Sequence, residues 1–141
     1  MDILSIPFHH LLNIEAYQKD GDFIFQVEER PELHNHLGTF HACAQLALAE
    51  ATSGEYLQQE FLELKDVVVP VIRRTEVKYS LPANGTLFSK ASFASGSKEE
   101  FLKDFQARKR CIIPIKVEVF NLENKRTLSA VFDWLISYKT T

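Results

Sequence analysis

Alternating apolar and polar positions mark five segments of the chain as predicted β-strands, because successive side chains of a strand point to opposite faces of its sheet. The segments are residues 23–28, 67–81, 86–94, 113–119 and 128–138. Residues 82–85, with the sequence PANG, are typical of a turn, so we expect the strands on either side of them to pair as a hairpin. A polar loop joins the last two strands.

Two surface helices are predicted from apolar residues at helical spacing. Residues 1–21 form an N-terminal helical segment, which we expect to end near Gly21. Residues 97–109 form an added surface helix. Ser97 followed by Glu100 is the pattern of a capping box, which supports a helix start at this point.

The segment 41–53 predicts a buried helix. Its sequence, HACAQLALAEATS, is small and apolar on nearly every side. Gly54 is expected to end this helix, ahead of a second helical stretch over 55–66. Such an apolar helix must be shielded from water, and a curved antiparallel sheet of about five strands can enclose it. The sequence therefore predicts one α+β domain over 1–141, with the sheet wrapped around a single long helix.

Composition excludes several classes of protein. The 141 residues carry 16 Lys and Arg against 19 Asp and Glu, a net charge of −3, without a basic tract, so we expect no nucleic-acid partner. No uninterrupted apolar segment approaches the ~18 residues that span a membrane. Cys43 and Cys111 lie in apolar surroundings, and no secretory leader is evident. We expect a reduced, cytoplasmic protein.

The segment NHLGTFHACAQLALAEA, residues 35–51, resembles the signature of the hotdog-fold acyl-CoA thioesterases of the phenylacetate-degradation type. The matching positions are Asn35, Gly38, Thr39, His41 and Glu50. A weaker similarity lies in VKYSLPANG, residues 77–85, and the resemblance covers about residues 22–138. It implies the hotdog fold, in which a curved sheet surrounds one central helix.

The resemblance also implies an activity, the hydrolysis of an acyl thioester of coenzyme A or of a carrier protein, with no cofactor and no metal. Glu50 would act as general base or nucleophile, and Asn35 would position the water or the thioester. The start of the helix would bind the substrate through four residues: Gly38, Thr39, His41 and Ala42. Gly38 permits an unusual backbone angle, and Thr39 is expected to cap the helix. Unpaired N–H groups at this helix start would stabilise the oxyanion.

Helix geometry adds a constraint on this site. Ten residues separate Phe40 from Glu50, so a rise of ~1.5 Å per residue places Glu50 roughly 15 Å along the axis, out of reach of Asn35. His41 and Glu50 lie on opposite sides of the helix, because nine steps of ~100° amount to a half turn. One reaction centre must therefore combine two chains. We expect a two-fold homodimer or a homotetramer, in agreement with the family's sites between protomers.

Two departures from the family pattern leave other functions open. The family has His-Gly-Gly where this chain has His41, Ala42 and Cys43, and a serine of some relatives aligns near Ile72. A non-catalytic acyl-binding or structural hotdog protein is the main alternative. The fourteen-residue separation of His36 and Glu50 is similar to that of hotdog dehydratases, so dehydration or hydration of an acyl thioester is another.

Several single residues have more ordinary interpretations. Glu50 could face solvent, and Asn35 could be a turn residue. His34, His36 and His41 could hold a metal, but no Asp or Cys completes the ligand set. Cys43 could be a nucleophile, although a small buried packing residue is the commoner role. The phosphates of coenzyme A could meet any of three basic pairs: Arg73 and Arg74, Lys109 and Arg110, or Lys125 and Arg126.

Overall fold

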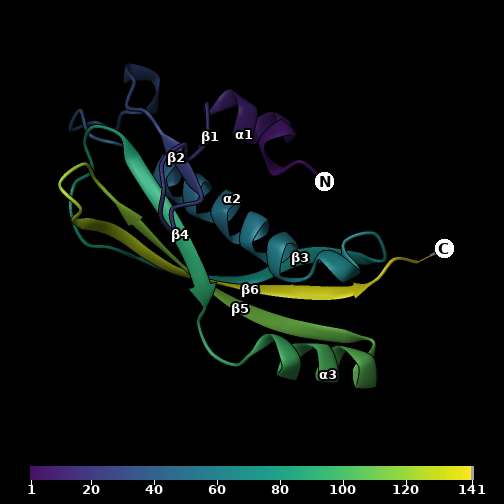
Figure 1. The fold of residues 1–141 in the computed structure, drawn as a ribbon. Coiled ribbons are helices and arrows are strands. Elements are labelled where there is room, and N and C mark those ends of the chain that lie inside the picture. Colours follow the sequence, from purple (N-terminus) through teal and green to yellow (C-terminus); the bar gives the residue numbers. More distant parts are fainter. Residues whose placement is uncertain (141) are drawn as a thin grey trace.

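One long helix, α2 (Ala42–Glu60), lies in the concave face of a curved antiparallel sheet in this computed structural model, which describes residues 1–140 (Figure 1). The six strands run in the order β1-β2-β4-β5-β6-β3. They are β1 (Glu15–Ala16), β2 (Phe25–Val27), β3 (Val68–Tyr79), β4 (Leu87–Phe93), β5 (Arg110–Phe120) and β6 (Arg126–Tyr138). The predicted fold is confirmed. The sixth strand is the two-residue β1, which extends the sheet beyond β2.

The core lies between α2 and the inner face of the sheet. The alternation in β5 and β6 turns every second side chain inward, and these inward residues are buried. They are Cys111, Ile113, Ile115, Val117 and Val119 in β5, and Leu128, Ala130, Phe132, Trp134 and Ile136 in β6. Small residues on α2, such as Ala49 and Ala51, let the helix approach this surface closely. The predicted burial of the helix is therefore correct.

The expected hairpin between 67–81 and 86–94 is wrong. β3 pairs with β6 along its whole length, whereas β4 lies between β2 and β5. The turn residues do not reverse the chain into a neighbouring strand, because Ala83 is fully buried and its carbonyl accepts the Phe40 N–H at 2.9 Å. The loop thus packs against the chain just before α2. Alternation identifies a strand but does not identify its partner.

Short helices flank this unit. At the N-terminus, η1 (Ile3–Ser5) and α1 (Pro7–Leu11) are helical, so the expected helical segment 1–21 is wrong beyond α1, and β1 follows instead. The surface helix is α3 (Lys98–Arg108), and the Ser97 hydroxyl accepts the Glu100 N–H at 3.3 Å, as its capping box predicts. Two further one-turn helices are η2 (Pro31–Leu33) and η3 (Leu62–Leu64). Among residues 1–140, no helix is both long and apolar enough to cross a membrane.

Gly54 does not end the central helix, contrary to expectation, because α2 continues to Glu60. The helix needs no glycine here for its backbone angles. A Cβ at this position would meet Ile3 Cδ1 at 3.5 Å and Trp134 Cζ2 at 3.7 Å, which are ordinary contacts. Gly54 instead leaves space beside these two side chains.

Gly54→Ala is therefore expected to stabilise the protein. Glycine inside a helix is less favourable than alanine by about 0.5–1 kcal/mol, and the new methyl group meets no clash. Urea denaturation followed by circular dichroism should show the free energy of unfolding rising by about that amount. A decrease would mean that the space beside Gly54 cannot accept a methyl group.

Candidate functional site

The Glu50 carboxylate faces α1. Its side chain is 34% exposed, and Oε2 lies 3.3 Å from Nε2 of His9. His9 is buried, and its Nδ1 lies 2.8 Å from the carbonyl oxygen of Ile3. Sequence analysis did not identify His9. The sequence does contain an indication for His9, which lies three residues from both Ile6 and Leu12. Both of these residues pack on the core.

A small cavity of about 140 Å³ opens beside the Glu50 carboxylate. Its apolar walls include Ile3, Ile6, Leu57, Pro70 and Trp134. The Trp134 indole N–H donates to the Ser53 hydroxyl at 2.9 Å, and that hydroxyl donates to the Glu50 carbonyl at 2.7 Å. Strand β6 thereby fixes the helical turn that carries Glu50.

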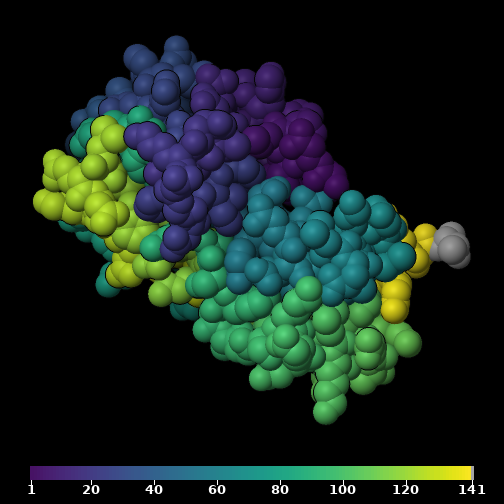
Figure 2. All heavy atoms as spheres, viewed as in Figure 1, coloured from purple at the N-terminus to yellow at the C-terminus, as the bar shows by residue number. Residues whose placement is uncertain are grey.

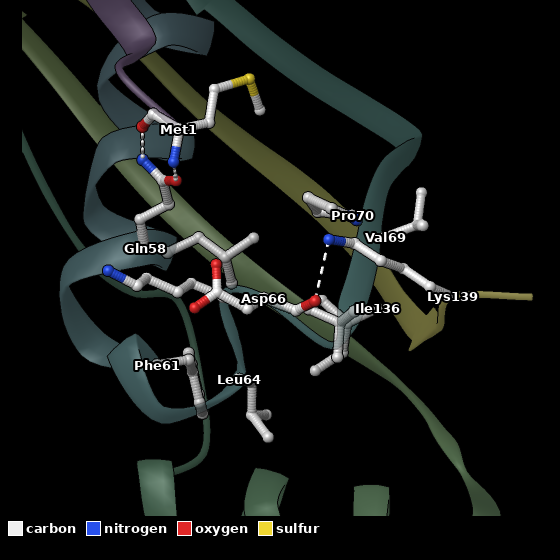
Figure 3. A pocket seen from close by; sticks show the side chains of 12 residues that line it. Met1, Gln58, Phe61, Leu64, Asp66, Val69, Pro70, Ile136 and Lys139 are labelled. Atoms are coloured by element: carbon white, nitrogen blue, oxygen red, sulfur yellow. Dashed lines mark hydrogen bonds between the residues drawn. The ribbon is translucent and has the colours of Figure 1, made fainter. Parts of the chain in front are cut away.

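A larger apolar groove, of about 390 Å³, is shown in Figure 3. It adjoins this cavity and shares Met1, Leu57, Gln58 and Pro70 with it. Its other apolar walls are Phe61, Leu64, Val68, Val69 and Ile136. At one rim the Lys139 ammonium donates to the Asp66 carbonyl at 2.9 Å. The cavity and the groove thus adjoin each other, and we call the two together the apolar path.

The N-terminal segment borders both spaces. Gln58 on α2 binds the first residue of the chain: its Oε1 accepts from the Met1 amino group at 3.0 Å, and its amide donates to the Met1 carbonyl at 2.8 Å (Figure 3). The space-filling view shows the N-terminal segment, in purple, directly against the teal atoms of α2 (Figure 2).

Asn35 organises the loop before α2. Its Oδ1 accepts the N–H groups of Leu37 and Thr39 at 2.9 and 3.1 Å, and its amide donates to Thr39 Oγ1 at 3.0 Å and to the Phe40 carbonyl at 3.3 Å. Gly38 has φ +74°, a conformation that favours glycine. The polar atoms of Asn35 are thus engaged within its own loop, which agrees with its alternative interpretation as a turn residue.

The amino end of α2 lies beside this loop. His41, not Thr39, caps the helix: its Nδ1 accepts the Cys43 N–H at 3.0 Å. The N–H groups of Ala44 and Gln45 bind the His41 carbonyl. In the described part of the chain, the Ala42 N–H is therefore the first-turn donor that remains without a partner.

An open hollow of about 290 Å³ adjoins this helix end, and Asn35, Ala42, Gln45 and Tyr79 line it. The Tyr79 hydroxyl donates to the Ala42 carbonyl at 3.1 Å. Burial raises the pKa of Tyr79, and the nearby Cys43 adds to the effect, so this hydroxyl keeps its proton at neutral pH. Gln45 is buried, and its Oε1 has no hydrogen-bond partner among the described residues. In the sequence, the indication for Gln45 is that it is the single glutamine within the apolar run HACAQLALAEA.

The expected site residues therefore form two groups in one chain. Asn35, Gly38, Thr39, His41 and Ala42 lie together at the amino end of α2. Glu50 lies eight residues beyond Ala42, or ~12 Å along the axis, and faces a different cavity.

No group of three or more His, Cys, Asp and Glu side chains that could hold a metal ion occurs within residues 1–140. His34 instead pairs with Glu29, with 3.0 Å between Nε2 and Oε1.

The two cysteines differ in environment. Cys111 is buried, whereas Cys43 is exposed, which contradicts its expected role as a buried packing residue, because it lies on the outward side of the first turn of α2. Burial raises the pKa of the Cys111 thiol to about 11, and the neighbouring Asp104 contributes.

We expect iodoacetamide to alkylate Cys43 in the folded protein and to spare Cys111. The thiolate is the reactive form, and a raised pKa keeps Cys111 protonated until the pH approaches 11. Peptide mass spectrometry after labelling at mildly alkaline pH, with and without denaturant, measures both sites. Equal labelling of the two thiols in the folded protein would contradict this assignment.

Solved structures share this architecture at low sequence identity. A protein of unknown function from Pseudomonas aeruginosa, PA5026, described as a probable thioesterase, has a TM-score of 0.82 and 14% identity over 97% of this chain and 91% of its own. The BH2602 protein from Bacillus halodurans, solved with CoA, has a TM-score of 0.63 and 15% identity over 79% of this chain and 69% of its own.

The thioesterase SAV0944 from Staphylococcus aureus, in a variant with one glutamine replaced by alanine, has a TM-score of 0.69 and 12% identity over 92% of this chain and 98% of its own. These likenesses establish the hotdog fold. No curated protein matches this chain in sequence.

One family model covers most of the chain. It matches residues 12–136, from just after α1 to two residues before the end of β6, and thus includes Asn35, Glu50 and nearly the whole sheet. Its description is a domain of unknown function, DUF4442. This chain belongs to the DUF4442 family.

Proposed function

We propose that this protein hydrolyses acyl thioesters of the acyl-CoA class at a site formed by two copies of the chain. Glu50 comes from one copy, and the Asn35 loop with the amino end of α2 comes from the other. The observation that carries the proposal is that both half-sites lie along β3. Pro70 near the start of β3 lines the Glu50 cavity, and Tyr79 at its end lines the hollow beside Asn35.

A two-fold axis through β3 would join these half-sites. Among residues 1–140, only β6 pairs with β3, so the other edge of β3 is free for pairing. Antiparallel pairing of two β3 edges brings the Pro70 end of one copy to the Tyr79 end of the other. Each Glu50 then lies near the hollow of the partner, which removes the separation that exists within one chain.

The groups at this joint site suit thioester hydrolysis. The Glu50 carboxylate takes a proton from a water molecule as the water oxygen bonds to the thioester carbon. The Ala42 N–H, at the positive end of α2, donates to the oxyanion that forms on the carbonyl oxygen. Collapse of this intermediate breaks the carbon–sulfur bond, and the leaving sulfur receives the proton from Glu50. The products are a carboxylic acid and a thiol.

The apolar path beside Glu50 provides a place for the acyl group. The cavity and the adjoining groove together expose mainly aliphatic and aromatic walls, with Lys65, Asp66 and Lys139 as the charged residues of the groove. Burial of apolar surface favours an aliphatic or aromatic acyl chain over a polar one.

The structural relatives add support at the level of the fold. PA5026 is described as a probable thioesterase, SAV0944 as a thioesterase, and BH2602 was solved with CoA. In two SAV0944 structures a glutamine and a glutamate, fifteen positions apart, were each replaced by alanine. Asn35 and Glu50 have the same separation in this chain. This match supports a shared role for Asn35 and Glu50 in the proposed site.

A second candidate function is acyl binding without turnover. Two observations favour it: the polar atoms of Asn35 are engaged within its own loop, and Ala42 and Cys43 carry side chains where the resembling family has glycines. A bound acyl-CoA that co-purifies with the protein and remains intact would favour this candidate.

The test is turnover by mixed dimers. The purified protein is assayed on acyl-CoA substrates of graded aliphatic length and on aryl-CoA substrates, through the loss of thioester ultraviolet absorbance. Glu50→Gln removes one half-site, and Ala42→Leu obstructs the other. If the site is shared, an equal mixture of these inactive variants regains about a quarter of the wild-type activity, because half of the dimers are mixed and each holds one intact site. No turnover on any substrate would exclude the hydrolase.

A further inference from the structure

His9 is held at both ring nitrogens, although the proposed hydrolysis does not use it. Nδ1 lies 2.8 Å from the carbonyl oxygen of Ile3, and Nε2 lies 3.3 Å from Glu50 Oε2. The residue is 4% exposed. A carbonyl oxygen only accepts hydrogen bonds, so the proton of a neutral His9 ring must be on Nδ1.

This assignment has a consequence for the contact with Glu50. A neutral ring with its proton on Nδ1 would direct the Nε2 lone pair at a carboxylate oxygen, and two acceptors repel each other. A further proton must lie on Nε2, so that the imidazolium donates to Oε2 and Glu50 keeps the carboxylate that the proposed hydrolysis needs. The His9–Glu50 pair therefore holds one more proton than a neutral imidazole and a carboxylate carry together. This proton forms the hydrogen bond between Nε2 and Oε2.

Apolar side chains lie next to this bond. Ile3, Ile6 and Trp134 line the same cavity, and low polarity strengthens a hydrogen bond. Within residues 1–140, the only other charged group that lines the cavity is the Met1 ammonium, which is bonded to Gln58 at 3.0 Å.

We propose that His9 is the positioning residue of Glu50: tethered to the Ile3 carbonyl, it fixes Oε2 through the shared proton and leaves Oε1 to meet the water that attacks the thioester. This role rests on the proposed hydrolysis. It gives α1 a function, because the short helix supplies the partner that orients a carboxylate on α2. Glu50 without this partner would be free to rotate away from the reacting water.

Two substitutions separate the tether from the positioning contact. An asparagine amide occupies roughly the place of Nδ1, so His9→Asn keeps a donor for the Ile3 carbonyl and loses the contact with Glu50. A glutamine amide reaches roughly the place of Nε2, so His9→Gln keeps a donor for Glu50 and loses the tether. Each variant loses one hydrogen bond and creates a comparable gap.

We expect His9→Asn to lower kcat by about tenfold or more with KM within about twofold, because a misplaced reacting group slows the chemical step more than it weakens binding. His9→Gln should retain at least about three times more activity than His9→Asn. Thermal midpoints should fall to a similar extent in both variants. His10→Asn is the matched control, since His10 is the exposed neighbour on α1, and it should match the wild type in both assays.

Equal kcat values for His9→Asn and His9→Gln would overturn the proposal, because a purely structural role predicts equal effects. Nitrogen NMR of the imidazole gives a second readout that needs no turnover, with the His9 signals assigned by their loss in His9→Asn. In Glu50→Gln the Nε2 resonance should shift while the Nδ1 resonance stays in place. An unchanged Nε2 resonance would exclude the shared proton, whereas a shifted one in a protein without turnover would exclude only the hydrolysis.

Discussion

Glu50→Gln is expected to lower kcat for acyl-CoA hydrolysis by about 10²–10⁴-fold, the usual contribution of a general base. The amide has the size of the carboxyl group but does not accept a proton from water. It can still donate to Nε2 of a neutral His9, so the contact with α1 is kept and the free energy of unfolding should change by less than ~1 kcal/mol. Steady-state kinetics and urea denaturation measure the two quantities.

Glu55→Gln is the matched control for this variant. Glu55 lies on the same helix and bonds to the Gln59 amide at 3.0 Å, away from the Glu50 cavity. It should keep the wild-type kcat. A Glu50→Gln protein that retains more than about a tenth of the wild-type kcat would show that another group activates the water.

Thr75→Pro is expected to convert the dimer to a monomer and to abolish hydrolysis, although it changes no residue of either half-site. The Ser80 N–H donates to the carbonyl of Thr127, the second residue of β6. Because N–H groups along an antiparallel strand point alternately to opposite sides, the Thr75 N–H points to the free edge of β3. Proline removes this donor and places its ring at the edge without breaking the ladder to β6.

The loss occurs twice in a two-fold interface, so the dimer should weaken by at least about thirtyfold, at roughly 1 kcal/mol or more for each lost hydrogen bond. Sedimentation velocity over a range of concentrations measures the association. Thr75→Val keeps the N–H and alters only the side chain, and it should remain dimeric and active. A Thr75→Pro protein that is monomeric but fully active would place the entire site within one chain.

The burial of α2 and the capping of α3 could be predicted from the sequence because each depends on neighbouring residues. The run of alanines around Leu48 indicates a helix enclosed by a sheet, and Ser97 with Glu100 marks the start of α3. Gly54 misled the prediction because the tendency of glycine to end helices is small beside the tertiary packing that continues α2. The partner of β3 was wrong because it lies about fifty residues away and no local pattern specifies it.

In the candidate site, too, neighbouring residues could be interpreted from the sequence, whereas contacts between distant residues could not. The motif drew attention to Asn35 and Glu50, and helix spacing alone indicates that one chain cannot join them. His9 and Gln45 could not be found in this way. The importance of His9 depends on its contact with Glu50, and that of Gln45 depends on its Oε1, which lacks a hydrogen-bond partner among the described residues. The exposure of Cys43 likewise depends on which side of the first turn of α2 faces the sheet.

The pairing of β3 with β6 alone also affects how the chain is made. β3 ends at Tyr79, and its partner β6 begins at Arg126, so the ribosome adds 46 residues between them. At about 5–20 residues per second, β3 waits roughly two to ten seconds as an unpaired strand, a state that invites aggregation. Pro70 and the charges on Arg73, Arg74, Glu76 and Lys78 protect the nascent strand during this delay.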